Sequence, residues 1–365
     1  MESDLEEQLP MKLVTFTVET PLGRCDRLGA LLDGDARGRI VDLTAAYEAY
    51  LRAETDEPTP RQLAALRTPP DMIGWLEGAH KAREAAEQAL AFVRRQLAGS
   101  ADPRGPDGAR LVYARHDVRL RAPLPRPRSL RDFSVFEEHM TRAPSIPPKA
   151  PKWYRYPPYY KGNPAAVIGP DDPIPYPYFT EQLDCELEIG IIIGREGRNI
   201  RVEDAKQYIA GYTIFIDCSA RDVYTRSDYF GPAKTKDWCN VLGPCLVTAD
   251  EIDEANLRVR LSVDGEVWYE GHTGHRRNYL AEHLVAFASD NETLYPGDVL
   301  GTGTIGLSCS MDTHRWVRVG QTITFEVEGI GTLSHRIVPG ERVVDYVLNG
   351  IPGLLTPPSS VVESG

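Results

Sequence analysis

The chain has 365 residues and a formal net charge of −12, because 53 acidic residues outnumber 41 lysines and arginines. Nucleic acids and anionic membranes both require concentrated positive charge, so this balance argues against either as a partner. No apolar run approaches the length of a membrane span and the polar start is unlike a signal peptide, so we expect a soluble, cytoplasmic protein.

The length of the chain predicts two units around separate cores. In the first unit, residues 11–18 alternate in polarity and predict a strand, with two short apolar runs after them as candidate partners. Residues 43–51 predict a helix, and residues 72–97 predict a long amphipathic helix rich in Ala, Glu, Arg and Gln. We therefore predict a small α+β domain over residues 1–120.

Proline and tyrosine crowd residues 143–178, which include the run WYRYPPYY at residues 153–160. Proline at this density excludes the interior of a helix. Two interpretations stay open, which are an ordered loop packed by its own aromatic rings and the wall of a binding pocket.

The run from Leu183 to Ile193 predicts a strand, because apolar and β-branched residues dominate it. Successive side chains of a strand point to opposite faces, so Asp184, Glu186 and Glu188 share one face. Such a face is commonly solvated. The alternative is a divalent cation between the carboxylates, which would offset their mutual repulsion.

A second strand-like run, residues 212–217, ends in another acid, Asp217. Aspartate at such a place commonly starts a turn or caps the next helix. The two acidic runs in this order nevertheless favour a metal site, with Asp217 as a ligand at the end of its strand.

Short strand patterns continue over residues 258–264 and 266–270, and Asp264-Gly265 between them predicts a tight hairpin. The second unit is therefore predicted to be mostly β structure. The proline-rich end, residues 351–365, is predicted to be disordered. The six cysteines have no Cys-x-x-Cys spacing, and we expect Cys185 and Cys218 to be buried thiols in a reducing cytosol instead of disulfide partners.

Five motifs in the same order resemble the fumarylacetoacetate hydrolase family over about residues 120–345. The pair Glu186-x-Glu188 is followed 29 residues later by Asp217, within an Asp-x-Ser-Ala-Arg-Asp setting. Asp132 with His139 seven residues later resembles the first metal ligand and the catalytic histidine of the family. The remaining matches are Tyr160 to Asn163, Lys234 ten residues before Pro244, and the turn Gly301 to Thr304.

The resemblance implies an α+β fold, mostly β, in which a mixed β-roll over residues 121–350 follows the smaller N-terminal α+β domain. It also implies a metal shell made of four carboxylates, which are Asp132, Glu186, Glu188 and Asp217. A shell of oxygen atoms alone favours Mg²⁺ over zinc, with Mn²⁺ and Ca²⁺ as alternatives.

In the family arrangement, His139 would be the general base that activates water. A neighbouring acid usually sets the tautomer of such a histidine, and the sequence leaves three candidates, which are Glu137, Glu138 and Asp312. The chain departs here from many smaller relatives, because His139 is not followed by a glutamate three residues later.

The remaining roles also follow from the resemblance. Lys234 would stabilise the enolate that leaves after cleavage, with help from Thr304. Arg221 would bind a substrate carboxylate, unless it pairs with a local acid such as Asp222. Further substrate contacts are implied at Tyr160 and at Tyr224, which stands where the hydrolase itself has an amide side chain. Lys236 stands where many relatives have an apolar residue.

Together these residues imply a metal-dependent catabolic hydrolase that cleaves a C–C bond of an acylpyruvate or a fumarylacetoacetate-like β-diketo acid through an enolate held at the metal. The partner would be a small keto acid, and the family implies a homodimer. The same scaffold also hosts decarboxylases, isomerases and sugar-acid dehydratases. An alternative of another class is a non-catalytic ligand-binding protein that keeps the metal for stability.

Overall fold

The computed structural model describes residues 11–34, 38–142, 152–226, 233–349 and 351–352. More residues lie in strands than in helices, and the sheets do not close into barrels. This confirms the predicted α+β fold with a majority of β structure. Most of the tail that was predicted to be disordered, residues 353–365, lies outside the described residues.

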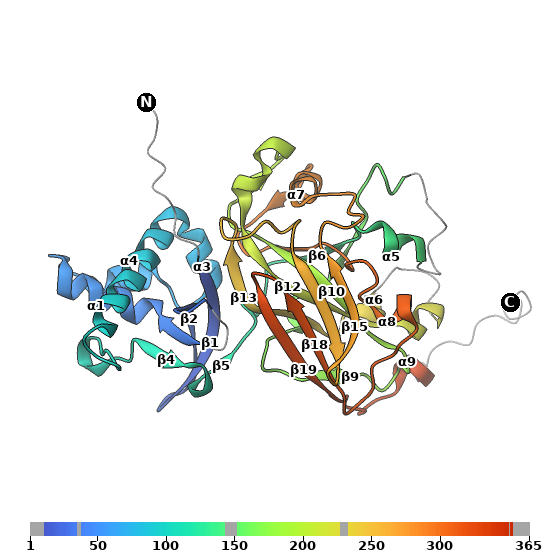
Figure 1. Ribbon diagram of the computed structural model, residues 1–365, viewed down its shortest axis with the longest axis horizontal. Helices are drawn as coiled ribbons and strands as arrows, with labels where there is room; N and C mark the ends of the chain where they lie inside the picture. Colours follow the sequence, from blue (N-terminus) through green and yellow to red (C-terminus); the bar gives the residue numbers. More distant parts are fainter. Residues whose placement is uncertain (1–10, 35–37, 143–151, 227–232, 350, 353–365) are drawn as a thin grey trace, which may run out of the picture.

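One sheet of twelve strands connects the two predicted units (Figure 1). Its main path runs through β4 (Val112–Ala114), β3 (Arg39–Asp42), β2 (Gly23–Leu31), β1 (Lys12–Thr20), β13 (Asn240–Thr248), β12 (Ile209–Ala220), β10 (Leu183–Ile193), β17 (Val299–Gly301), β6 (Leu130–Phe133) and β7 (Tyr159–Gly162). Off this path, β5 (Arg119–Leu120) pairs with β1 and β8 (Val167–Ile168) pairs with β13. Strand β1 of the first predicted unit pairs directly with β13 of the second, so the sheet continues across the boundary predicted at residue 120. That domain boundary stays a prediction.

A second sheet of five strands contains β15 (Glu266–His272), β14 (Arg258–Val263), β18 (Thr322–Val327), β19 (Gly331–Pro339) and β9 (Ile174–Tyr176). Apolar side chains of this sheet, such as Leu261 and Phe325, share one buried cluster with Leu187 and Ile189 of β10. The hairpin predicted at Asp264-Gly265 is present between β14 and β15. The pair β11 (Gly197–Arg198) and β16 (Thr293–Leu294) forms a small third sheet.

The helices lie in two groups (Figure 1). Beside β1 to β4 lie α1 (Leu43–Glu54), α2 (Pro60–Arg67), α3 (Met72–Glu77) and α4 (Ala79–Leu97). The short helices α5 (Glu137–Arg142), α6 (Ala233–Lys236) and α8 (Ser310–Thr313) lie beside β10 and β12, and the remaining two are α7 (Ala281–Ser289) and α9 (Tyr346–Asn349). Among the described residues, no helix has both the length and the apolar character that a membrane span requires.

The single helix predicted over residues 72–97 is wrong, because the chain breaks between α3 and α4. Ala79 has a φ of +48°, in the left-handed region that interrupts a right-handed helix. A Cβ on Gly78 would approach the Cβ of Ala82 to 2.7 Å, so only glycine allows this close crossing. The indole of Trp75 donates a hydrogen bond across the break to the carbonyl oxygen of Ala82, at 3.2 Å.

The side chain of Asp42, the last residue of β3, bonds both to Arg27 of β2 and to the start of α1. We expect the loss of this carboxylate to destabilise the fold. Its buried carboxylate accepts hydrogen bonds from the Ala45 backbone at 3.0 Å and from the Arg27 guanidinium at 2.8 and 3.0 Å. Asp42→Ala should lower the free energy of unfolding by about 2–4 kcal/mol, as measured by urea denaturation. Asp33→Ala removes an exposed pair with Arg39 and should cost less than about 1 kcal/mol. Equal effects of the two substitutions would contradict this.

Candidate active site

Three acidic side chains of β10 lie on one buried face. The exposed fractions of Asp184, Glu186 and Glu188 are 0%, 2% and 1%, so the interpretation as a solvated face is wrong. Glu186 lies directly opposite Asp217 of β12 in the antiparallel register. Buried carboxylates are stable only when cations or hydrogen-bond donors compensate them, so this face requires partners of positive charge.

Three of the four predicted metal ligands lie together. Asp132 of β6, Glu188 of β10 and Asp217 of β12 each offer a carboxylate oxygen within 4.8 Å of the others, and all three residues are buried. Strand β17 lies between β10 and β6, and its residue beside Asp132 is Gly301. A Cβ on Gly301 would come within 2.8 Å of the Asp132 Oδ1, so the missing side chain leaves room for the carboxylates to converge.

These three carboxylates have the chemistry of a site for a divalent cation. In each of them one buried oxygen, the Oδ1 of Asp132, the Oε1 of Glu188 and the Oδ1 of Asp217, has no hydrogen-bond partner among the described residues. Burial raises the pKa of Glu188 well above its ordinary value, and the neighbouring Asp132 raises it further. Burial likewise raises the pKa of Asp217 well above its ordinary value, although the charge of Lys236 opposes this. A hard cation would remove the repulsion and satisfy the oxygens, so the residues fit the predicted metal.

Glu186, the fourth predicted ligand, lies outside this trio and pairs with protein cations. The guanidinium of Arg221 lies 2.5 Å from its Oε1, and the ammonium of Lys236 lies 2.5 Å from its Oε2. Burial opposes the ionisation of Glu186, but the charges of Arg221 and Lys236 outweigh it and hold the pKa well below its ordinary value. Glu186 is therefore held in its ionised form even without a metal.

The structure does not bring the predicted Lys234 into the carboxylate cluster. Its side chain is 55% exposed and lies 3.4 Å from Asp237. Lys236 reaches the cluster instead, where it is buried and donates to Glu186 and Asp217. Both lysines belong to the single turn α6, and residues two apart on a helix do not share a face, so only one of them can point inward. The number of residues between Lys234 and the Leu-Gly-Pro segment favours Lys234 in the sequence. The sequence signal for Lys236 instead is that a lysine stands there where many relatives have an apolar residue.

A lysine comparison tests this placement. Lys236→Met removes the cation from two buried carboxylates and should lower the free energy of unfolding of the metal-free protein by about 3–5 kcal/mol. Lys234→Met, on the exposed side of the same turn, should change it by less than about 0.5 kcal/mol. Chemical denaturation in EDTA measures both. A larger loss for Lys234→Met would show that α6 is oriented the other way.

Asp184, the third acid of the β10 face, anchors the segment that follows the glycine-threonine turn. It accepts hydrogen bonds from the backbone of Ser310 at 2.6 Å and of Met311 at 3.2 Å, at the start of α8. Arg221 donates to Asp184 at 2.9 Å and also contacts Glu186, so its acidic partners in the described contacts are these two residues of β10 and not the predicted alternative, Asp222. This network fixes α8, and therefore Asp312, beside β10.

His139 of α5 is buried, so it is not the helix-surface residue that its local sequence alone would suggest. Its Nδ1 lies 3.0 Å from the Oδ2 of Asp312, and its Nε2 lies 3.6 Å from the Oε1 of Glu186. Of the three candidate acids, Asp312 is thus the partner of the ring. Burial alone would lower the pKa of His139, but the hydrogen bond to Asp312 and the charge of Glu186 outweigh it, and the pKa lies above its ordinary value. This arrangement favours a histidine that accepts and holds a proton.

The other predicted substrate contacts mainly support the carboxylates. The Tyr160 hydroxyl donates to the Oδ2 of Asp217 at 2.8 Å, and the Thr304 hydroxyl donates to Glu186. The backbone N–H of Gly303 donates to the Oε2 of Glu188 at 2.8 Å, so the Gly301–Thr304 turn holds both glutamates. Tyr224 lies in the turn Arg221–Arg226, and its side chain is outside the described part of the chain.

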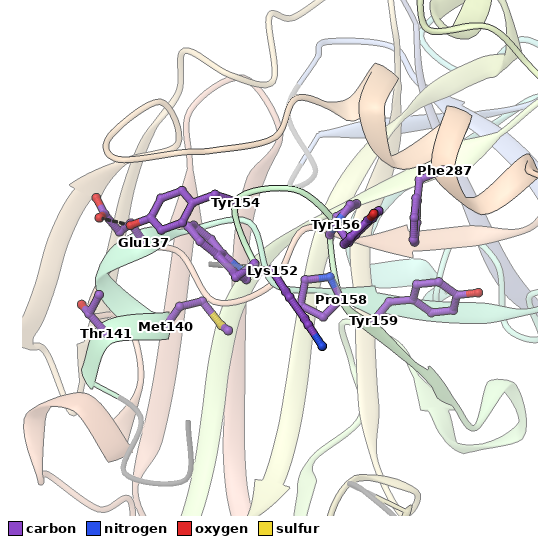
Figure 2. A pocket seen from close by; sticks show the side chains of 11 residues that line it. Glu137, Met140, Thr141, Lys152, Tyr154, Tyr156, Pro158, Tyr159 and Phe287 are labelled. Carbon is purple, nitrogen blue, oxygen red and sulfur yellow. Dashed lines mark hydrogen bonds between the residues drawn. The ribbon is translucent and has the colours of Figure 1, made fainter. Parts of the chain in front are cut away.

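The described part of the proline- and tyrosine-rich segment forms the wall of a pocket of about 440 Å³ (Figure 2). Tyr156, Pro158, Tyr159 and Phe287 of α7 lie together on one side of it, and Met140 and Thr141 of α5 lie on the other. The Tyr154 hydroxyl donates to Glu137 of α5 at 2.6 Å. The pocket borders the helix that carries His139, but its lining contains none of the carboxylates of the site.

Sequence comparison places the second part of the chain in a known family. The profile of the fumarylacetoacetate hydrolase C-terminal domain matches residues 130–338. The mitochondrial oxaloacetate tautomerase of Xenopus laevis is 31% identical over 337 residues, which cover 90% of this chain and 91% of that protein.

Solved structures with the same fold have different activities. Maleylpyruvate hydrolase from Sphingobium sp. SYK-6, crystallised with manganese(II) and pyruvate, matches with a TM-score of 0.63 at 23% identity, over 91% of this chain and 100% of that chain. The 5-carboxymethyl-2-hydroxymuconate delta-isomerase of Mycobacterium smegmatis matches with a TM-score of 0.53 at 29% identity, over 65% of this chain and 88% of that chain. Hydrolysis of a C–C bond, the activity expected first from the sequence, is thus one of several chemistries found on this fold.

Proposed function

The chain belongs to the fumarylacetoacetate hydrolase family, and we propose that it is a metal-dependent isomerase that interconverts the keto and enol forms of oxaloacetate or a closely related 2-oxo acid. The tautomerase of Xenopus laevis supports this choice, because the match covers nine-tenths of both chains. The observation that carries the proposal is the proton-accepting His139, held by Asp312 beside the buried carboxylates.

The electrostatics of the site support the need for a divalent cation. Six carboxyl groups gather there, those of Asp132, Asp184, Glu186, Glu188, Asp217 and Asp312. Only Arg221 and Lys236 provide permanent positive charge to them in the described contacts. Once the carboxyls of the trio are ionised, an anionic keto acid would be repelled by the excess of negative charge unless a cation neutralised part of it.

Asp132, Glu188 and Asp217 would hold that cation, with Mg²⁺ or Mn²⁺ as the candidates. When bound, the ion would polarise the oxygens of the 2-oxo acid and stabilise negative charge that develops on them. Tyr160 and Gly303 hold the other oxygens of Asp217 and Glu188, and so orient the two carboxylates.

His139 would move the proton. With its Nδ1 hydrogen-bonded to Asp312, the ring presents Nε2 toward the cluster, where it can take a proton from the carbon next to the keto group. The C–H bond breaks, its electrons form the enol double bond, and the proton is returned to the keto oxygen as O–H. No water or redox partner is consumed. The carboxylates of Asp312 and Glu186 stabilise the imidazolium between the two steps.

Hydrolysis of an acylpyruvate is the second candidate, because a histidine paired with a carboxylate can equally take a proton from water. The attack of water on the acyl carbonyl would then cleave the C–C bond, and Lys236 and Arg221 would lie near the charge of the departing enolate. The two reactions differ in whether the histidine deprotonates carbon or water.

The deciding experiment follows both reactions with the same metal-loaded protein. Enol oxaloacetate is followed by its ultraviolet absorbance against the uncatalysed rate, and acylpyruvates and maleylpyruvate are followed by product mass, with Mg²⁺ or Mn²⁺ and then EDTA. EDTA-sensitive loss of the enol without C–C cleavage would support the tautomerase. Cleavage of an acylpyruvate without faster tautomerisation would replace it with the hydrolase. Bound metal without turnover of any substrate would favour the non-catalytic ligand-binding protein.

The small keto acid as the partner follows from the same proposal. The homodimer and the cytoplasmic location stay predictions. Sedimentation of the purified protein and fractionation of the source cells would test them.

A further inference from the structure

A second group of side chains that could hold a metal ion surrounds the Nδ1 atom of His139 and contains none of the three carboxylates of the trio. Cys309 immediately precedes α8, which carries Asp312. The Sγ of Cys309 lies 3.9 Å from the Nδ1 of His139, and the Oδ2 of Asp312 lies 3.0 Å from the same nitrogen. One donor atom of each of the three residues lies within 4.8 Å of the others.

The two separations from Nδ1 are close to those of a tetrahedral zinc site. With Zn–N and Zn–O distances of about 2.0 Å and a Zn–S distance of about 2.3 Å, tetrahedral angles separate N from O by about 3.3 Å and N from S by about 3.5 Å. The observed separations of 3.0 and 3.9 Å differ from these values by a few tenths of an ångström. Small side-chain rotations therefore suffice to enclose the ion.

Burial and an unsatisfied oxygen point to a ligand as well. The side chain of Asp312 has no exposed surface, and its Oδ1 has no hydrogen-bond partner among the described residues. Cys309 is 4% exposed. The second ring nitrogen of His139 faces Glu186 at 3.6 Å, and a carboxylate in this position commonly orients a zinc-bound histidine.

The cysteine also lies near the donor oxygens of Asp184 and Glu186, but these carboxylates already have cationic partners. Arg221 contacts both of them, and Lys236 contacts Glu186. In the described contacts, the other two neighbours of Cys309, the His139 imidazole and the Asp312 carboxylate, are not paired with a lysine or an arginine. We propose that His139, Cys309 and Asp312 form a separate site for Zn²⁺, and that zinc bound there inhibits the enzyme.

The inhibition follows from the chemistry of the ligands. Zinc would bind the lone pair of the Nδ1 atom, so the proton that Nδ1 shares with Asp312 is released to solvent and the neutral ring carries its one proton on Nε2, facing Glu186. The thiol of Cys309 releases its own proton to solvent as it becomes the thiolate ligand. A zinc-bound imidazole cannot accept a proton during turnover. The nitrogen and sulfur donors favour Zn²⁺, whereas the all-oxygen trio favours Mg²⁺ or Mn²⁺, so the two sites select different ions. The inhibitory effect rests on the proposed role of His139, but the zinc site itself does not.

The binding experiment uses the full chain with Mg²⁺ in excess to fill the oxygen site, and Co²⁺ as a coloured probe for zinc. Cobalt at the proposed site should produce the near-ultraviolet charge-transfer absorption of a thiolate ligand, and one equivalent of Zn²⁺ should displace it. Cys309→Ser should abolish this absorption and weaken zinc binding in calorimetry by more than about 100-fold, because even residues beyond the direct ligands cost 10–100-fold. Cys25→Ser, which alters an exposed thiol, should retain both.

Turnover of oxaloacetate at increasing Zn²⁺ then tests the inhibition, with each variant compared to its own zinc-free rate. The wild-type protein and Cys25→Ser should be inhibited at the concentration that fills the thiolate site, and Cys309→Ser should need about 100-fold more zinc. A thiolate absorption that survives in folded Cys309→Ser, or equal inhibition of Cys309→Ser and wild type, would overturn the proposal. If thiolate-dependent zinc binding is found but no substrate is turned over, the zinc site stands and the proposed function fails.

Discussion

His139→Ala should lower kcat for oxaloacetate tautomerisation by about 10²–10⁴-fold, the usual contribution of a general base, while the protein still binds its divalent metal. The reason is geometric, because His139 is the described side chain that combines a titratable nitrogen with a carboxylate partner beside the trio. The expected loss lies in kcat more than in KM, since the ring acts on the reacting proton and the metal would bind the substrate. Stopped-flow absorbance of enol oxaloacetate measures both constants.

Two further variants serve as comparisons for His139→Ala, one at a surface histidine and one at the acid that orients His139. His275→Ala changes an imidazole that is 59% exposed and paired with Glu138, so it should leave kcat within about twofold, as expected for a surface substitution. Asp312→Asn keeps the shape but removes the charge that holds the Nδ1 proton, so it should give an intermediate loss. Activity that survives in metal-loaded His139→Ala would mean that another group moves the proton.

Glu188→Gln should abolish metal-dependent activity and at the same time stabilise the metal-free protein. Glu188 is 1% exposed, and burial together with the charge of Asp132 raises its pKa well above the ordinary value. An amide of the same shape removes that repulsion and can still accept the hydrogen bond from Gly303. It also removes one of the three charges that would hold the cation.

Thermal unfolding with and without metal separates the two effects. Wild type should gain about 2.7 kcal/mol when the free metal is 100 times its Kd, whereas Glu188→Gln should gain almost nothing under the same conditions. In EDTA the order should reverse, with the variant more stable than wild type. Glu203→Gln, whose side chain is 57% exposed, is the matched control and should respond to metal like wild type. If Glu188→Gln kept the full metal-induced stabilisation, Asp132, Glu188 and Asp217 would not be the metal site.

Local sequence patterns predicted much of this arrangement. The alternation of side chains along Leu183–Ile193 put three acids on one face, and all three are buried on one strand in the fold. Asp217, which was predicted to end the next long strand, lies three residues before the end of β12, opposite Glu186 in the register, as a shared site requires. The predicted helix over residues 72–97 breaks at Ala79, because an average pattern of polarity does not report a single residue with left-handed backbone.

The sequence by itself determined the acidic face, the strand period and the presence of a histidine near the first acid, because these depend on residues close together in the chain. Only the tertiary structure decided that Lys236 and not Lys234 enters the cluster, and that Asp312 is the partner of His139 from 173 positions away. It also decided that Cys309 lies beside the same ring. Strand order and the packing of α5, α6 and α8 against β10 and β12 create these contacts, and the spacing of residues along the chain does not contain that information.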